Sequence, residues 1–157
     1  MRIPPPFIAS LLCLSAATVS SGAAEKETRE DSAIGTELQA MNPAIETVIS
    51  GGFWERMDQD GSYRLIVRLE GWEHLANRVF LQWLRRDQDT HQIIVERTVP
   101  IAEFDAARWR ISEAKFVLAG KQWKIVLRAQ PTYEGQKVVF TIVPSADFTY
   151  KVTKGTK

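Results

Sequence analysis

Residues 78–84 read Arg-Val-Phe-Leu-Gln-Trp-Leu, a run that carries apolar side chains at both odd and even positions. In a β-strand its Val, Leu and Trp would point to one side and Phe80 and Leu84 to the other, because strand side chains alternate between faces. A strand that is apolar on both sides needs cover on both, or nearly so. The run therefore predicts a strand in the middle of the protein and not at an edge.

Segments on either side alternate in the same way. Residues 62–70 place Tyr, Leu, Val and Leu on one face and Arg64 and Arg68 on the other, and 122–130 place Lys124 and Arg128 opposite their own apolar set. Further short runs rich in β-branched and aromatic residues lie between turn signals at 44–50, 53–57, 92–99, 109–111, 115–118, 137–143 and 148–152.

About eight or nine short strands at this spacing predict an all-β fold. We expect an antiparallel β-sandwich, immunoglobulin-like in the broad sense. Pro100 can open a helix, so one short helical turn is predicted near residues 100–108.

The chain's organisation follows from its composition. Residues 1–24 have a basic start, an apolar run and small residues at the end, as in a cleaved signal peptide. Residues 25–41 are charged and poor in large apolar groups, which predicts a flexible lead-in. A single β-sandwich domain is expected at 42–153, with a loose tail at 154–157. The protein is thus expected to be exported, to the periplasm or outside the cell.

The single cysteine, Cys13, lies within the predicted signal. We do not expect a lipoprotein, because Leu12 stands where a lipidation signal calls for Gly, Ala or Ser. The mature chain would then have no disulfide and no thiolate site, so its stability must come from its core.

Charge narrows the range of partners. The chain holds 20 Lys and Arg against 19 Asp and Glu, and residues 1–24 contribute one Arg and no acid. A balanced chain lacks the concentrated positive charge that binds phosphate backbones, so no nucleic-acid partner is expected. No apolar segment beyond the signal approaches the roughly 20 residues of a membrane span, so no membrane insertion is expected after cleavage.

Five tryptophans suggest a second kind of surface, because flat aromatic faces can stack on sugar rings. Trp83 and Trp123 lie among alternating aliphatic residues, which predicts core positions. Trp54 and Trp72 sit beside glycines at strand ends, where exposure is more common. A glycan or small-ligand site would use Trp54, Trp72, Glu73 and His74.

Metal and cofactor chemistry has little support. No ligand spacing joins His74 and His91, the only histidines, with acids on one element. Asp58-Gln-Asp-Gly61 resembles the start of a calcium loop but has Leu69 where the loop needs a bidentate Glu, so a hairpin turn is the preferred interpretation. No metal and no cofactor is expected.

The outward side chains Arg64, Arg68, Lys124 and Arg128 would form one basic stripe if their two strands were neighbours. Such a stripe would suit an acidic protein or an anionic glycan, and the alternative is a solvated sheet face whose cations discourage aggregation.

No nucleophile motif, phosphate loop or catalytic set appears, and none of the patterns identifies a family. We therefore expect a non-catalytic binding protein that acts on a protein partner through a sheet face or strand edge, in an inhibitor, immunity or assembly role. The alternatives are a glycan or small-ligand module using exposed Trp, and a hydrolase whose site is assembled only in space. A homodimer formed through an edge strand remains open.

Overall fold

The computed structural model describes residues 36–105 and 108–156. The predicted signal peptide and most of the predicted lead-in lie outside the described residues, as does Lys157. The chain divides into two units, Met1–Met41 and Asn42–Lys157. Of the first unit the structure describes a short helical segment at 36–39, and all the strands belong to the second.

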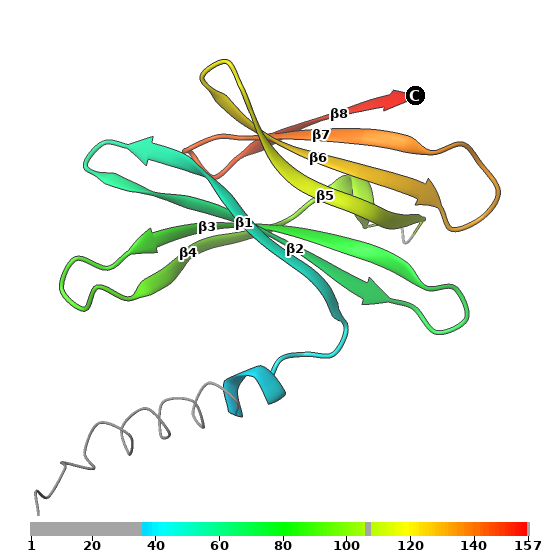
Figure 1. The fold of residues 1–157 in the computed structure, drawn as a ribbon, viewed down its shortest axis with the longest axis horizontal. Coiled ribbons are helices and arrows are strands. Elements are labelled where there is room, and N and C mark those ends of the chain that lie inside the picture. Colours follow the sequence, from blue (N-terminus) through cyan, green and yellow to red (C-terminus); the bar gives the residue numbers. More distant parts are fainter. Residues whose placement is uncertain (1–35, 106–107, 157) are drawn as a thin grey trace, which may run out of the picture. The chain divides into compact units, whose positions relative to one another are not determined.

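The second unit holds two antiparallel sheets of four strands each (Figure 1). The first sheet has the order β1-β2-β3-β4 and the second the order β5-β6-β7-β8. Their bounds are β1 Ile45–Arg56, β2 Gln59–Glu70, β3 Ala76–Arg86, β4 Ile93–Pro100, β5 Trp109–Ala119, β6 Gln122–Pro131, β7 Val138–Pro144 and β8 Tyr150–Thr156.

The fold is therefore an antiparallel β-sandwich, as the alternating strands predict. Each sheet is a meander in which strands adjacent in sequence are also hydrogen-bonded neighbours. Immunoglobulin domains share the two-layer architecture but interleave their strands between sheets by Greek-key connections. This protein therefore resembles immunoglobulin domains in its two-layer architecture but differs from them in how its strands are connected.

Several predicted boundaries are wrong in instructive ways. The segments predicted as strands 44–50 and 53–57 form one strand, β1, with a register shift between Gly51 and Trp54. Strand β5 likewise joins 109–111 to 115–118 through a shift between Ile111 and Glu113. Among the described residues of 100–108 the helical turn is η1, Ala102–Phe104, and it begins after Pro100 because Pro100 ends β4. The predicted loose tail is wrong up to Thr156, where β8 ends.

One hydrophobic core lies between the sheets and draws on both. Trp83 is 0% exposed, as predicted, and its indole N–H donates to the backbone oxygen of Ser145 at 2.8 Å. Trp123 is half-buried and packs against the edge of the core, so its predicted core position holds only in part. The largest fully buried side chains are Trp83, Phe104, Leu65, Leu81, Ile101, Ile125, Leu127 and Ile142.

A buried amide joins the two layers. Asn77 on β3 is 0% exposed, its Oδ1 accepts a hydrogen bond from the backbone N–H of Ile111 on β5, and its Nδ2 donates to Glu46 on β1. A buried polar group is tolerated only when hydrogen-bonded, so this side chain fixes how one end of the first sheet meets the second.

Candidate functional site

The predicted aromatic pair does not exist. Trp54 is 2% exposed, packs edge-on against Phe148, and donates its indole N–H to the backbone oxygen of Ser62 at 3.1 Å. Trp72 is 96% exposed. Trp54 pairs with Gly61 near the start of β2, whereas Trp72 follows the end of that strand. At about 3.3 Å per residue the two rings are roughly 30 Å apart along β2.

Trp72, Glu73 and His74 do lie together, on the exposed loop between β2 and β3. The loop between β6 and β7 reaches the same end of the sandwich (Figure 1). The ring of its Tyr133 lies 5.1 Å from the His74 ring. The sequence analysis missed Tyr133, although it lies between Pro131 and Gly135, two turn residues that mark an exposed loop.

The predicted basic stripe is also wrong, because β2 belongs to the first sheet and β6 to the second. Arg64 and Arg68 alternate with the buried residues of β2, so they lie on the outer face of the first sheet. Lys124 and Arg128 alternate with the buried residues of β6 and lie on the outer face of the second. The two pairs face opposite directions.

The outer face of the first sheet carries an unexpected row of apolar side chains. Strand pairing aligns Val48 with Ile66, Ile66 with Phe80, and Phe80 with Pro100, one from each of the four strands. We call these four residues the apolar row. Inward-facing neighbours such as Leu65 and Leu81 are fully buried, which places the row on the side away from the second sheet.

Arginines border this row on both sides. Arg64 is paired with Gln82 and Arg68 with Arg78 across β2 and β3. The Arg78 guanidinium lies 5.8 Å from the centre of the Phe80 ring, and Arg78 also pairs with Asp105 at 2.7 Å. These side chains therefore extend over the sheet and cover part of its apolar surface with their stems.

Polar atoms without partners gather on the same face. Among the described residues five buried side-chain nitrogen or oxygen atoms have no hydrogen-bond partner, and four of them belong to Arg64, Arg68, Arg78 and Gln82. Ion pairs with Glu70 hold Arg68 at 3.2 Å and Arg78 at 3.4 Å. Arg64 has no ion pair within the described part of the chain.

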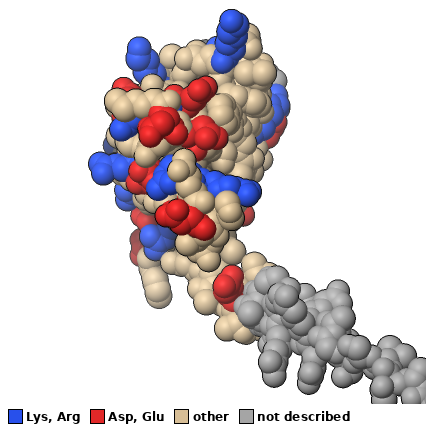
Figure 2. Space-filling view, turned by 90° about the vertical axis from the view of Figure 1, so that its left-hand side faces the viewer, with Lys and Arg blue, Asp and Glu red and all other residues tan. Residues whose placement is uncertain are grey.

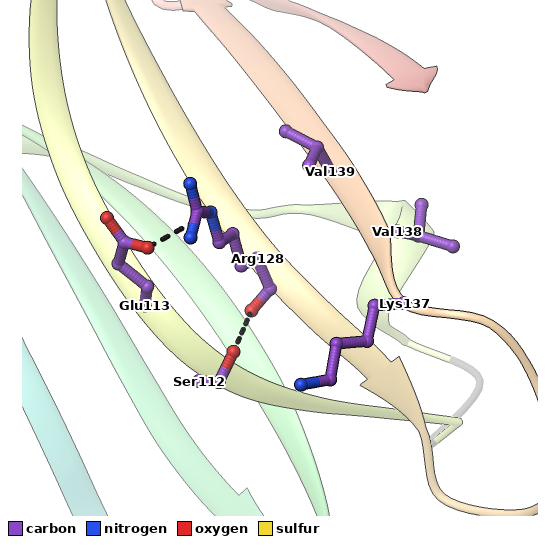
Figure 3. A pocket seen from close by; sticks show the side chains of 6 residues that line it. All are labelled: Ser112, Glu113, Arg128, Lys137, Val138 and Val139. Atoms are coloured by element: carbon purple, nitrogen blue, oxygen red, sulfur yellow. Dashed lines mark hydrogen bonds and ion pairs between the residues drawn. The ribbon is translucent and has the colours of Figure 1, made fainter. Parts of the chain in front are cut away.

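A separate depression of about 310 Å³ lies on the second sheet (Figure 3). The Glu113 carboxylate there pairs with Arg128 at 3.1 Å and with Lys115 at 2.8 Å. The Ser112 hydroxyl donates to the backbone oxygen of Arg128 at 3.2 Å, and no histidine lines the depression to act as its base. These contacts hold the bulged part of β5 against β6, and they assemble no nucleophile.

The β1–β2 turn and the β3–β4 loop lie at the opposite end of the first sheet from Trp72. Figure 2 shows acidic and basic side chains side by side on this end of the molecule. Asp58, Asp60, Asp87 and Asp89 line an open depression of about 630 Å³, with Arg and His side chains among them. The Asp87 carboxylate accepts hydrogen bonds from the backbone N–H and hydroxyl of Thr90, which hold its pKa below the usual value. Asp87 thus stabilises its own turn, and within residues 36–105 and 108–156 no three His, Cys, Asp or Glu side chains are grouped to hold a metal ion.

No helix among the described residues has the length and apolar character needed to cross a membrane. No family model matches the chain, and comparisons with curated proteins and with solved structures give no match either.

Proposed function

We propose that this protein is a non-catalytic binding module that acts on a protein partner through the outer face of its first sheet. One observation carries the proposal: the apolar row crosses all four strands and is bordered by arginines whose Nε atoms are buried without partners. We propose further that it acts after export, in the periplasm or outside the cell.

The arginines favour a partner that presents carboxylates beside apolar side chains. Arginine is enriched in interfaces because its planar guanidinium pairs with carboxylates in two places and also stacks on apolar and aromatic surface. Buried Nε atoms indicate that Arg64, Arg68 and Arg78 already lie along the sheet. Side chains that are ordered before binding lose less rotamer freedom when a partner arrives.

Charge also weighs against self-association through this face. A two-fold contact would bring the same patch from two copies together. If the two-fold axis passes close to the middle of β2, the Arg64 side chains of the two copies would meet, and like charges in contact oppose association. The same repulsion favours an acidic partner.

The experiment compares Arg64→Glu with Lys124→Glu, which makes the same charge change on the opposite face. Wild type and both variants are immobilised and exposed to the exported proteins of the producing cell, and the retained proteins are quantified by mass spectrometry. We expect a protein that wild type and Lys124→Glu retain alike and that Arg64→Glu binds at least about tenfold more weakly, or about 1.4 kcal/mol. Circular dichroism and the unfolding midpoint check that both variants fold.

Two results would count against this function. In the first, Arg64→Glu and Lys124→Glu weaken retention of the partner protein equally. In the second, neither variant changes how much of that protein is retained. If the retained protein is a second copy of the chain, the face serves self-association instead.

A further inference from the structure

We propose that the loops between β2 and β3 and between β6 and β7 form a second site, which binds neutral oligosaccharides through Trp72 and Tyr133. The site is independent of the apolar row, because it lies on loops at the end of the sandwich and not on the outer face of a sheet (Figure 1). We call residues 71–75 and 132–136 the aromatic loops.

Exposure of the aromatic side chains is the first observation. Trp72 is 96% exposed and Tyr133 is 63% exposed, although each offers one of the largest apolar surfaces of any side chain. Burying such surface is favourable, so two large rings left open at one end of a folded domain indicate a binding surface. The 5.1 Å contact between the rings of His74 and Tyr133 brings the two loops together.

Both loops are tightly closed at their bases, which constrains their backbones. Gly71 has φ +114°, and a Cβ there would lie 2.2 Å from the backbone oxygen of His74. In the other loop a Cβ on Gly135 would lie 2.7 Å from the ring of Pro131. Trp72 and Tyr133 thus extend from two loops whose backbones are constrained before binding, so less backbone conformational entropy is lost when a ligand binds.

The carboxylates next to the two rings favour a sugar over an anionic lipid surface. Each aromatic residue is followed by an exposed carboxylate, Glu73 after Trp72 and Glu134 after Tyr133. Carboxylates accept hydrogen bonds from hydroxyl groups but repel anionic headgroups. Lys137, just beyond the second loop, points toward Ser112 in the depression on the second sheet (Figure 3). A flat ligand with apolar ring faces and a rim of hydroxyls matches this arrangement.

The test uses cellohexaose and hexa-N-acetylchitohexaose, neutral chains whose equatorial substituents leave flat apolar ring faces. Each is titrated to millimolar concentration into the ¹⁵N-labelled protein, and the indole N–H signal of Trp72 is assigned from its disappearance in Trp72→Phe. In wild type and in every variant the dissociation constant is measured from the backbone amide signals of the aromatic loops. We expect at least one sugar to shift this signal, and Trp72→Ala and Tyr133→Ala to weaken binding at least tenfold. Met57→Ala, which removes a side chain that is 90% exposed on the β1–β2 turn, should leave binding unchanged.

The remaining outcomes are equally decisive. If neither sugar shifts the signal, or if Trp72→Ala binds sugar as well as wild type does, the proposed site is wrong. A shift caused only by phosphatidylcholine vesicles containing phosphatidylglycerol would assign the loops to a lipid surface instead. Arg64→Glu should bind sugar normally, so failure of the protein-binding function and failure of this site can be told apart.

Discussion

Replacing Asn77 with alanine should destabilise the protein strongly, because this side chain serves both sheets. The change leaves the backbone N–H of Ile111 without the acceptor now 2.7 Å away, and an unpaired buried donor costs about 1–3 kcal/mol. It also removes the hydrogen bond to Glu46, and bonds to charged groups contribute about 1.5–3 kcal/mol. The Glu46 side chain is one-third exposed and also pairs with Arg110. Losing the hydrogen bond between Asn77 and Glu46 should therefore cost an amount near the low end of that range. We expect a total near 3 kcal/mol, a large part of the roughly 5–15 kcal/mol typical of a folded domain.

A second substitution at the same position distinguishes the contribution of the hydrogen bond to Ile111 from that of the hydrogen bond to Glu46. Asn77→Asp keeps an acceptor for Ile111 but places a carboxylate against the carboxylate of Glu46. Their repulsion should destabilise this variant at neutral pH, and the deficit should shrink as the pH falls and one carboxyl takes up a proton. Asn77→Ala has no such group, so its deficit should change less with pH.

Urea unfolding at neutral and acid pH measures both effects. Gln130→Ala is the control, because Gln130 is an exposed amide on the outer side of β6, and its loss should change stability by less than about 0.5 kcal/mol. A loss below about 1 kcal/mol for Asn77→Ala would refute the role assigned to this amide, since it is less than one unpaired buried donor should cost. The role would also be refuted if the stability losses of Asn77→Ala and Asn77→Asp depended on pH to the same extent.

Two further predictions concern the end of the first sheet away from Asn77, around Tyr63. Gly52→Ala should cost about 1–3 kcal/mol in urea unfolding, because φ is +71° and the new Cβ would lie 2.9 Å from the Tyr63 ring. Gly120→Ala shares the positive φ but has nothing within 4 Å, so it should cost only the backbone part, about 1 kcal/mol. Burial, with a smaller contribution from the Asp147 carboxylate, raises the pKa of Tyr63 to about 12. Tyrosine in the unfolded chain ionises near pH 10. Tyr63 therefore makes its full contribution to the free energy of unfolding below about pH 10, and that contribution should fall by roughly 3 kcal/mol as the pH rises towards about 12. Unfolding midpoints of Tyr63→Phe should lack that part of the decline.

The alternation in residues 62–70, 78–84 and 122–130 was enough to predict the fold class and the buried faces of three strands. Period two is a local property of the chain and needs no knowledge of which strands pair. The order of the strands is not local, and the basic stripe failed for that reason. Nothing between Arg68 and Lys124 in the sequence indicates that the chain passes from one sheet to the other near η1.

The prediction that Trp54 is exposed failed because a glycine beside a tryptophan can lie either in an exposed loop or at a bulge within a strand. Gly71 has a positive φ in an exposed loop, and Trp72 next to it is exposed. Gly51 and Gly52 instead lie at a bulge in β1, after which Trp54 points inward. Gly61, opposite Trp54 on β2, provides the space, since a Cβ there would lie 2.9 Å from the indole ring. One glycine leaves room for a buried indole ring, and the other lies in a loop that carries an exposed one. The sequence does not distinguish the two cases until the strand pairing is known.

The two-sided apolar character of residues 78–84 links the sequence to the proposed function. β3 does lie inside its sheet, between β2 and β4, as predicted. The expectation of cover on both sides is met on the Leu81 and Trp83 side, where the second sheet packs, and at Leu84 on the other side, which is 4% exposed, but it is not met at Phe80. On the other side Phe80 is only half-buried, and the cover within the described residues includes the stem of an arginine. Cross-strand apolar pairs on an outer face contribute only about 0.2–1 kcal/mol each to the stability of the sheet. Solvated polar residues at these four aligned positions would keep the face soluble, which an exposed apolar row does not. The row therefore makes physical sense as a surface that another molecule covers.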